Sequence, residues 1–237
     1  HGAGTVGPVL VSLALGVGAA AAVFSAIQGV VLSPFPYDGA ARMFVIKTAT
    51  RGAPPSAAYM WASRFADLLT ARSIDDGIMW DVFPMTSTRN SLPEAVSAGK
   101  VSVNTFRFLG VPPFLGRTFD GDFSANTPDE AVAVLGYRYW QSRYGGTREV
   151  LGQAIDLDHR PHTIIGVMPE RFRFLDADLY VPLPGVPHPF PTVIRLAPGI
   201  TTASAAGEMQ PIFREVARQF NVPDYQELAV SLVPFSE

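Results

Sequence analysis

Two histidines stand closest to a metal-binding pattern in this sequence. His159 and His162 lie three residues apart in a polar segment that also contains Arg160 and Pro161. Histidine nitrogens bind zinc, but a zinc site needs three or four protein ligands. The chain has no cysteine, and no third ligand stands at a suitable spacing. We therefore expect both histidines to be exposed polar groups of a turn, and we predict no metal-binding residues.

Two acidic pairs could bind calcium instead. Asp75 and Asp76 are adjacent, and Asp120 and Asp122 flank Gly121. Calcium loops of the EF-hand type space their acidic ligands in a fixed pattern that neither pair follows. Ordinary roles in turns and helix caps explain these residues better.

Motifs of catalysis are missing as well. The sequence contains no Walker A loop, no GxSxG elbow and no HExxH pair. Without cysteine there is no thiol nucleophile and no disulfide. A net charge of −3 and the lack of a long basic run exclude the usual footprint of a nucleic-acid-binding protein. We predict that the chain is not an enzyme and has no catalytic or cofactor-binding residues.

The elements that would position these residues follow from periodicity and turn signals. A hairpin is expected around the two histidines, with Ile155, Leu157, Ile164 and Val167 as candidates for its core. A helix over 137–144 carries four aromatic residues, for which core packing and a surface hot spot both remain open. We expect strands at 43–48, 78–88, 95–103, 131–135, 153–158, 163–167, 179–182, 192–196 and 228–233, and helices at 56–72, 105–109, 137–144 and from Thr201 or Thr202 to 219.

This order predicts an α+β fold. A strand–helix–strand unit comes first, a β-rich segment follows, and a second strand–helix–strand unit closes the chain. The two outer units can share one sheet, with the middle segment as an insertion.

The N-terminal segment has a different composition. Residues 2–37 contain no Asp, Glu, Lys or Arg, whereas the whole chain is 16% charged. A helix needs about 20 apolar residues to cross a bilayer, and residues 6–32 exceed that length. We predict a transmembrane helix over 6–32, ended by Ser33 and the prolines that follow. A cleaved signal peptide and a buried core helix are the alternatives.

Several segments together resemble a known family, the MacB-like periplasmic core domain of ABC-transporter permeases. The nearest resemblance is to the duplicated orphan permeases. The segments occur in the order and approximate spacing of that family, and they cover residues 13–37, 101–119, 131–146, 151–174, 178–183 and 195–209.

The resemblance implies a location and an organisation. The chain would lie in the bacterial cytoplasmic (inner) membrane, with residues 6–32 as the first transmembrane helix and the residues after about 37 on the periplasmic side. The core domain would span 42–237. Residues 42–103 and 190–237 would form a porter-like subdomain, and residues 104–189 an inserted β-rich subdomain.

It also implies a function and partners. Members transmit ATP-driven conformational change for export or extrusion across the cell envelope. They work as dimers with a cytoplasmic ABC ATPase, and often with a periplasmic adaptor. The basic stretch before the first helix and the later membrane helices of the family are not in this sequence. Two other hypotheses stay open: a membrane-tethered binding or scaffold domain without transport activity, and a secreted hydrolase with an unrecognised site.

Overall fold

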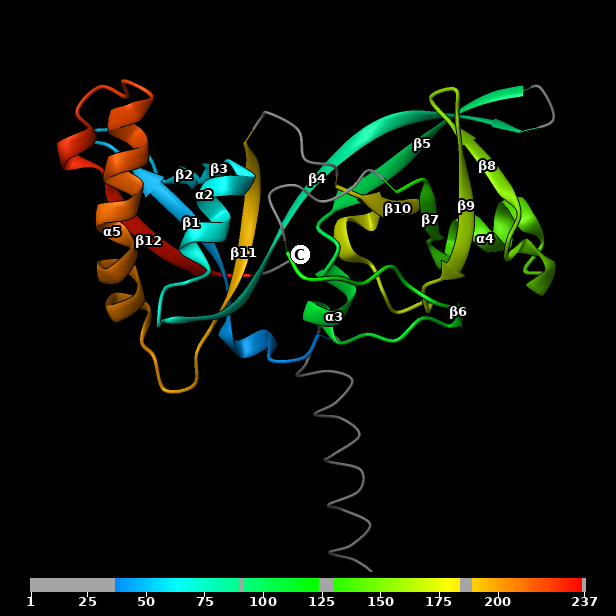
Figure 1. The fold of residues 1–237 in the computed structure, drawn as a ribbon, viewed down its shortest axis with the longest axis horizontal. Helices are drawn as coiled ribbons and strands as arrows, with labels where there is room; N and C mark the ends of the chain where they lie inside the picture. Colours follow the sequence, from blue (N-terminus) through cyan, green and yellow to red (C-terminus); the bar gives the residue numbers. More distant parts are fainter. Residues whose placement is uncertain (1–36, 90–91, 124–129, 184–188, 236–237) are drawn as a thin grey trace, which may run out of the picture. The chain divides into compact units, whose positions relative to one another are not determined.

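A long antiparallel hairpin runs through the fold (Figure 1). It consists of β4 (Ile74–Arg89) and β5 (Leu92–Val101), which pair from Trp80 opposite Val101 to Arg89 opposite Leu92. This computed structural model describes residues 37–89, 92–123, 130–183 and 189–235. Because β4 has 16 residues, its beginning and its end can pair with different strands.

The other elements follow in chain order. The remaining strands are β1 (Met43–Ala49), β2 (Ser56–Ala57), β3 (Tyr59–Met60), β6 (Leu115–Gly116), β7 (Val132–Leu135), β8 (Ala154–Leu157), β9 (Arg160–Val167), β10 (Leu179–Pro182), β11 (Phe190–Leu196) and β12 (Ala229–Pro234). The α-helices are α2 (Ala62–Leu68), α3 (Thr105–Leu109), α4 (Tyr137–Tyr144) and α5 (Thr202–Gln219). Short 3-10 helices are η2 (Ala40–Arg42), η3 (Arg148–Val150), η4 (Phe174–Asp176) and η5 (Tyr225–Glu227).

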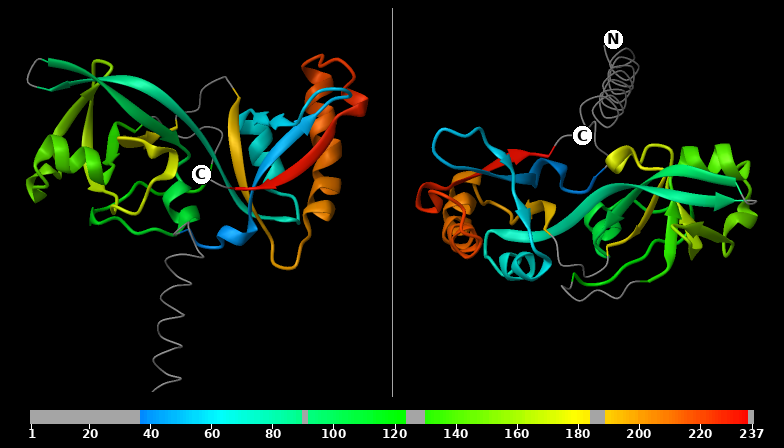
Figure 2. Two further views of the ribbon diagram at one scale, coloured as in Figure 1. Left: turned by 180° about the vertical axis from the view of Figure 1, so that it is seen from behind. Right: turned by 90° about the horizontal axis from the view of Figure 1, so that it is seen from above.

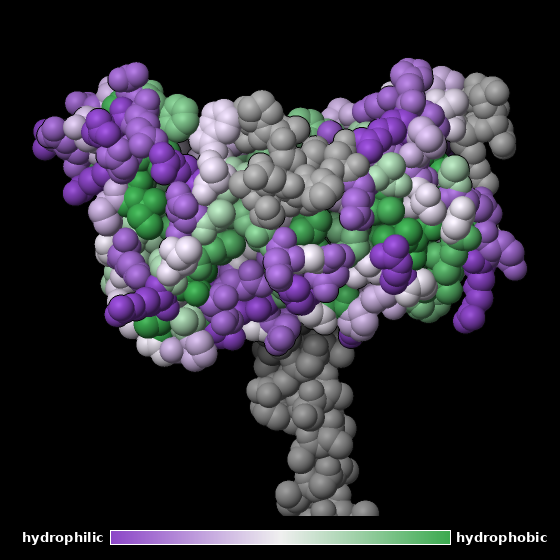
Figure 3. Space-filling model, viewed as in Figure 1, coloured by the Kyte–Doolittle hydropathy of each residue, from purple (hydrophilic) through white to green (hydrophobic). Residues whose placement is uncertain are grey.

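One half of the fold packs two helices on one face of a sheet. In Figure 2, α2 and α5 lie on the same side of β1, β11 and β12. Phe65 and Leu68 of α2 and Met209 and Phe213 of α5 are buried in the shared core. Figure 3 shows some hydrophobic residues at the surface of this half, among hydrophilic ones. The apolar stripe of each helix therefore faces the sheet, as the amphipathic pattern of the sequence requires.

The other half contains the β8–β9 hairpin. Its core includes Ile155, Leu157, Ile164 and Val167, each at most 3% exposed. The hairpin prediction and its four core residues are therefore confirmed. β9 pairs in parallel with β7, and β10 pairs in parallel with β5, whereas all the other strand pairs are antiparallel.

Both halves belong to one mixed sheet, with the strand order β12-β1-β11-β4-β5-β10-β7-β9-β6. The predicted α+β class is confirmed. The partner of β4 changes along its length: Ile74–Met79 faces β11, and Trp80–Arg89 faces β5. Residues 37–237 form one compact unit. The division at residues 103 and 190 into two subdomains stays a prediction, and the partners of β4 change well before residue 103.

One helix is shorter than predicted. Instead of starting at Ser56, α2 starts at Ala62, because residues 56–60 form β2 and β3. Ser56 lies opposite Thr48 of β1, and Met60 lies opposite Phe190 of β11. Backbone groups that bond neighbouring strands cannot also form helical hydrogen bonds, so the prediction that Ser56 caps the helix was wrong.

The predicted transmembrane helix over 6–32 lies outside the described residues. Within the part of the chain that the structure describes, no helix combines the length and the apolar composition needed to cross a bilayer.

Candidate functional site

The two ends of the described domain meet in a cluster of aromatic rings. Tyr37 is buried, and its ring centroid lies 6.1 Å from that of Phe172 and 6.3 Å from that of Phe174. Phe235 lies 6.3 Å from Tyr37 and 6.1 Å from Phe174. Both edge-on contacts of Tyr37 have the geometry that aromatic rings prefer. We call Tyr37, Phe172, Phe174 and Phe235 the chain-end junction.

Phe174 is held by an unusual backbone. The next two residues, Leu175 and Asp176, have φ angles of 63° and 45°, in the left-handed region that non-glycine residues rarely adopt. The hydroxyl of Tyr180, a buried residue, donates a hydrogen bond to the carbonyl of Phe174 at 2.5 Å. The ring of Tyr180 in turn packs 5.8 Å from Phe106 of α3. The junction therefore connects directly to β10 and to α3.

An arginine clamp holds the chain just after Tyr37. Arg195 of β11 donates hydrogen bonds to the carbonyls of Asp38, at 3.0 Å, and Phe108. Its guanidinium group also lies 4.4 Å from the centre of the Phe108 ring, in a cation–π arrangement. The backbone N–H of Asp38 donates to the carbonyl of Leu109 at 3.0 Å. Both β11 and α3 therefore bind the entering chain.

Gly39 allows this clamp to close. Its φ angle is 65°, and a Cβ atom at this position would lie 3.1 Å from Nε of Arg195. A side chain here would thus be strained in the backbone and crowded against the clamp.

A buried polar cluster lies where α3 meets β4. The Asn104 side-chain amide donates to the Asp76 carboxylate at 3.1 Å and to the Gly77 carbonyl at 2.9 Å. The Gly77 N–H donates to the same carboxylate at 2.7 Å. Loss of solvation raises the pKa of Asp76, while these hydrogen bonds and the nearby Arg195 oppose the rise.

The other acidic residues singled out from the sequence are exposed and ion-paired. Asp75 lies 3.5 Å from Arg42. Asp120 and Asp122 lie 3.4 Å and 3.2 Å from the two terminal nitrogens of Arg107. Arg42 thus pairs with Asp75, and Asp120 and Asp122 share the single positive charge of Arg107.

The two histidines lie in different environments. His159 is exposed at the hairpin turn, whereas His162 is only 6% exposed in β9. A ring nitrogen of His162 lies 2.9 Å from the carbonyl of Arg160. The expectation that both are exposed was wrong for His162, because alternation along β9 turns it inward. In the described ranges, no three His, Asp or Glu side chains are grouped as a metal site would require.

The aromatic residues of α4 divide between the two roles left open. Tyr139 and Trp140 are buried in the core, and the indole N–H of Trp140 donates to the carbonyl of Thr147 at 3.0 Å. Tyr137 instead packs at 5.7 Å against Phe114, a 56% exposed ring. Core packing thus accounts for Tyr139 and Trp140, while Tyr137 and Tyr144 are partly buried and pack against the edge of the same core.

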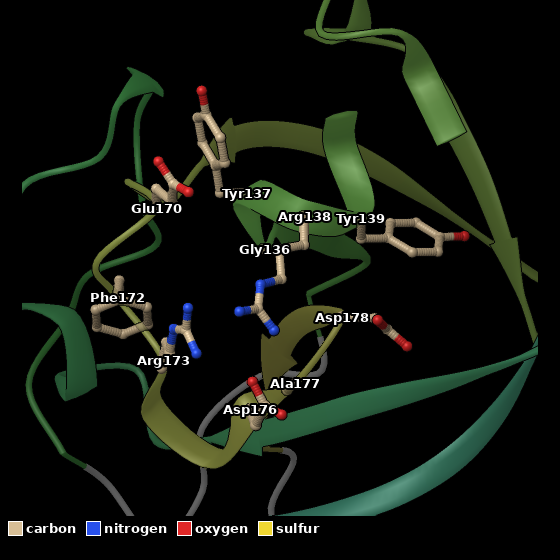
Figure 4. A pocket seen from close by; sticks show the side chains of 10 residues that line it. All are labelled: Gly136, Tyr137, Arg138, Tyr139, Glu170, Phe172, Arg173, Asp176, Ala177 and Asp178. Atoms are coloured by element: carbon tan, nitrogen blue, oxygen red, sulfur yellow. The ribbon is translucent and has the colours of Figure 1, made fainter. Parts of the chain in front are cut away.

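A small polar pocket of about 110 Å³ borders the junction through Phe172. Figure 4 shows the guanidinium groups of Arg138 and Arg173 pointing into it, with Glu170 and Asp176 at its edges. Its ten lining residues include no histidine, serine, threonine or lysine. The pocket therefore offers charges of both signs, from Arg138 and Arg173 and from Glu170, Asp176 and Asp178.

Sequence reasoning did not find the chain-end junction. Tyr37 and Phe235 lie at opposite ends of the described chain, and Phe172 and Phe174 lie in the segment between β9 and β10. The sequence signal was limited to Tyr37 and Phe235, which stand next to the domain boundaries.

Comparison with known families and structures agrees with this architecture. The MacB-like periplasmic core domain family matches residues 9–212. A search of curated proteins gives no match. A domain of a protein assigned as a permease in Porphyromonas gingivalis is 16% identical, with a TM-score of 0.62, and covers 84% of this chain and 93% of its own.

Two further structures share the fold. The periplasmic region of MacB from Actinobacillus actinomycetemcomitans is 11% identical, with a TM-score of 0.59, over 81% of this chain and 89% of its own. The extracellular domain of the noncanonic ABC-type transporter YknZ from Gram-positive bacteria is 15% identical, with a TM-score of 0.61, over 81% and 99%. The family match spans most of the sequence, and the chain belongs to the MacB-like periplasmic core domain family of ABC-type permeases.

Proposed function

We propose that this chain is the extracytoplasmic part of a permease subunit in the bacterial cytoplasmic membrane. It passes on ATP-driven conformational change for export or extrusion across the cell envelope. In this proposal residues 6–32 cross the bilayer, and a separate cytoplasmic ABC ATPase hydrolyses ATP. The chain itself is not an enzyme, and the working permease is a dimer that can engage a periplasmic adaptor.

The chain-end junction carries this proposal. Tyr37 and Phe235 both contact Phe174, so a displacement of either end of the domain reaches the same ring. Close-packed side chains compress little and pass on displacement. From Phe174 the contacts continue through Tyr180 to Phe106 of α3. Movement at the ends would thereby reach both halves of the sheet.

The test uses the complete permease together with its ATPase in membrane vesicles. Phe235→Ala removes one ring of the junction, and Phe114→Ala removes an exposed ring elsewhere on the domain. We expect Phe235→Ala to lower transport severalfold while ATP hydrolysis continues. Without this ring, the ATP-driven conformational change no longer reaches Phe174 from this end of the domain. Phe114→Ala should leave both rates unchanged.

Transport at the wild-type rate by a correctly folded Phe235→Ala permease would contradict the proposal. If transport also failed to depend on the ATPase, a membrane-tethered scaffold domain would become the better description.

A further inference from the structure

An apolar hollow lies at the opposite end of β1 from the chain-end junction. At one end of this strand, the carbonyl of Met43 accepts a hydrogen bond from Phe235. At the other end, Thr48 lines a hollow of about 300 Å³ beside the C-terminal half of α5. The lining residues are Thr48, Ala58, Tyr59, Trp61, Pro189, Phe213, Val216, Ala217, Phe220, Val222 and Leu228.

Small residues leave the space, and aromatic residues border it. Ala58 and Ala217 line the hollow, and the single methyl group of each is too short to fill it. Trp61 and Phe220 stack in parallel, with ring centroids 5.7 Å apart and planes 9° apart. Tyr59 stands beside them and is 60% exposed. Two rigid rings in contact give one side of the hollow a defined shape.

Filling an apolar hollow of this kind with a ligand is energetically favourable. The atoms that line it lose dispersion contacts on the side where no atom lies. Water inside gains few hydrogen bonds, because the lining side chains offer only three polar groups, the hydroxyls of Thr48 and Tyr59 and the indole N–H of Trp61. An apolar molecule that replaces this water restores the contacts, and the two hydroxyls can orient it.

The lining also restricts the class of ligand. None of the eleven lining residues is charged, and a buried charge without a partner is costly. Four of them are aromatic and favour stacking against a planar ring. The volume lies at the lower end of the range for small-molecule pockets and is too small for a helix, which is about 10 Å wide. We propose that this hollow is a binding site for an uncharged small molecule that contains an aromatic ring.

The experiment uses indole as the probe and the full chain in lipid nanodiscs. Saturation-transfer NMR measures indole binding, and tetramethylammonium serves as a charged competitor that aromatic rings can also attract. Ala217→Leu fills the hollow from α5, and Ala58→Leu fills it from the link between β2 and β3. Ala203→Leu is the matched control, since Ala203 is exposed on α5 and does not line the hollow.

We expect saturable indole binding to the wild type and to Ala203→Leu, and binding weaker by about tenfold or more in both filled variants. A melting curve of each variant checks that it folds. If only one of the two filled variants folds, that variant alone is enough to test the proposal. The absence of saturable binding to the wild type would overturn the proposal. So would unchanged binding in a folded filled variant, or displacement of indole by tetramethylammonium. None of these outcomes depends on transport, so this site can fail while the proposed permease function stands.

Discussion

Asp76 places a half-buried carboxyl group where β4 meets α3. Its partners are the Asn104 side chain and the Gly77 N–H, and Arg195 lies close enough to act on it electrostatically. Burial raises its pKa above the ordinary value of 3.8 in spite of these partners. The folded domain therefore holds this proton more tightly than the unfolded chain does.

This gives a pH dependence with a definite sign. As the pH rises from 3.8 through the raised pKa of Asp76, the unfolded chain releases the proton first, so the free energy of unfolding falls. Asp76→Asn removes this contribution. We expect the wild type to lose stability relative to Asp76→Asn over this interval, as measured by urea unfolding of the full chain at a series of pH values.

Asp75→Asn, at the exposed neighbouring position, controls for the loss of one negative charge. A constant difference between wild type and Asp76→Asn at every pH would show that the Asp76 pKa is the same in both states.

At the scale of elements, α5 shows how a local signal defines a helix end. Thr201 has extended backbone angles, and its hydroxyl accepts a hydrogen bond from the Ser204 N–H at 3.2 Å. The sequence offered Thr201 and Thr202 as equal candidates for this cap. The structure selects Thr201, and the helix then runs for 18 residues across the sheet.

Replacing this cap should weaken the fold by a modest amount. Thr201→Ala leaves an N–H of the first turn without its partner, and such substitutions cost about 1 kcal/mol. Thr202→Ala changes the same residue type one position later, where the side chain is exposed. Chemical denaturation should show a lower free energy of unfolding for Thr201→Ala alone. An equal loss in both variants would mean that Thr202 shares the capping role.

At the scale of the whole molecule, the contacts of residues 37–42 decide where the domain begins. A boundary at residue 42 was predicted from the sequence, yet Tyr37 is buried in the chain-end junction. Asp38 is bonded to Leu109 and Arg195. The described residues from 37 onward form one compact unit.

We therefore expect a fragment of residues 37–237 to be more stable than one of residues 42–237. The difference should be about 2–4 kcal/mol, from the burial of one aromatic side chain and two hydrogen bonds. Thermal melting of the two fragments measures this difference in stability.

Neither Mg–ATP nor zinc should raise the melting midpoint of either fragment, since only a ligand that binds the native state would do so. Equal midpoints would show that residues 37–41 add nothing to the fold.

The sequence by itself determined the elements whose signals are local. α3 ends at Gly110 and α4 at Gly145, both in the left-handed conformation that glycine allows. The β8–β9 hairpin, with Ile164 on its buried face, follows from alternation on both sides of a polar turn.

Only the tertiary structure decided how distant segments meet. Residues 59–60 become a strand because β11, far along the chain, supplies their partner, and residues 56–57 pair with β1 across the loop that precedes them. Tyr37 and Phe235 share Phe174, although almost the whole domain lies between them in the chain. Such contacts depend on the burial of rings from separate elements and on the pairing of strands that are distant in the sequence. Periodicity within a short window of the sequence predicts neither.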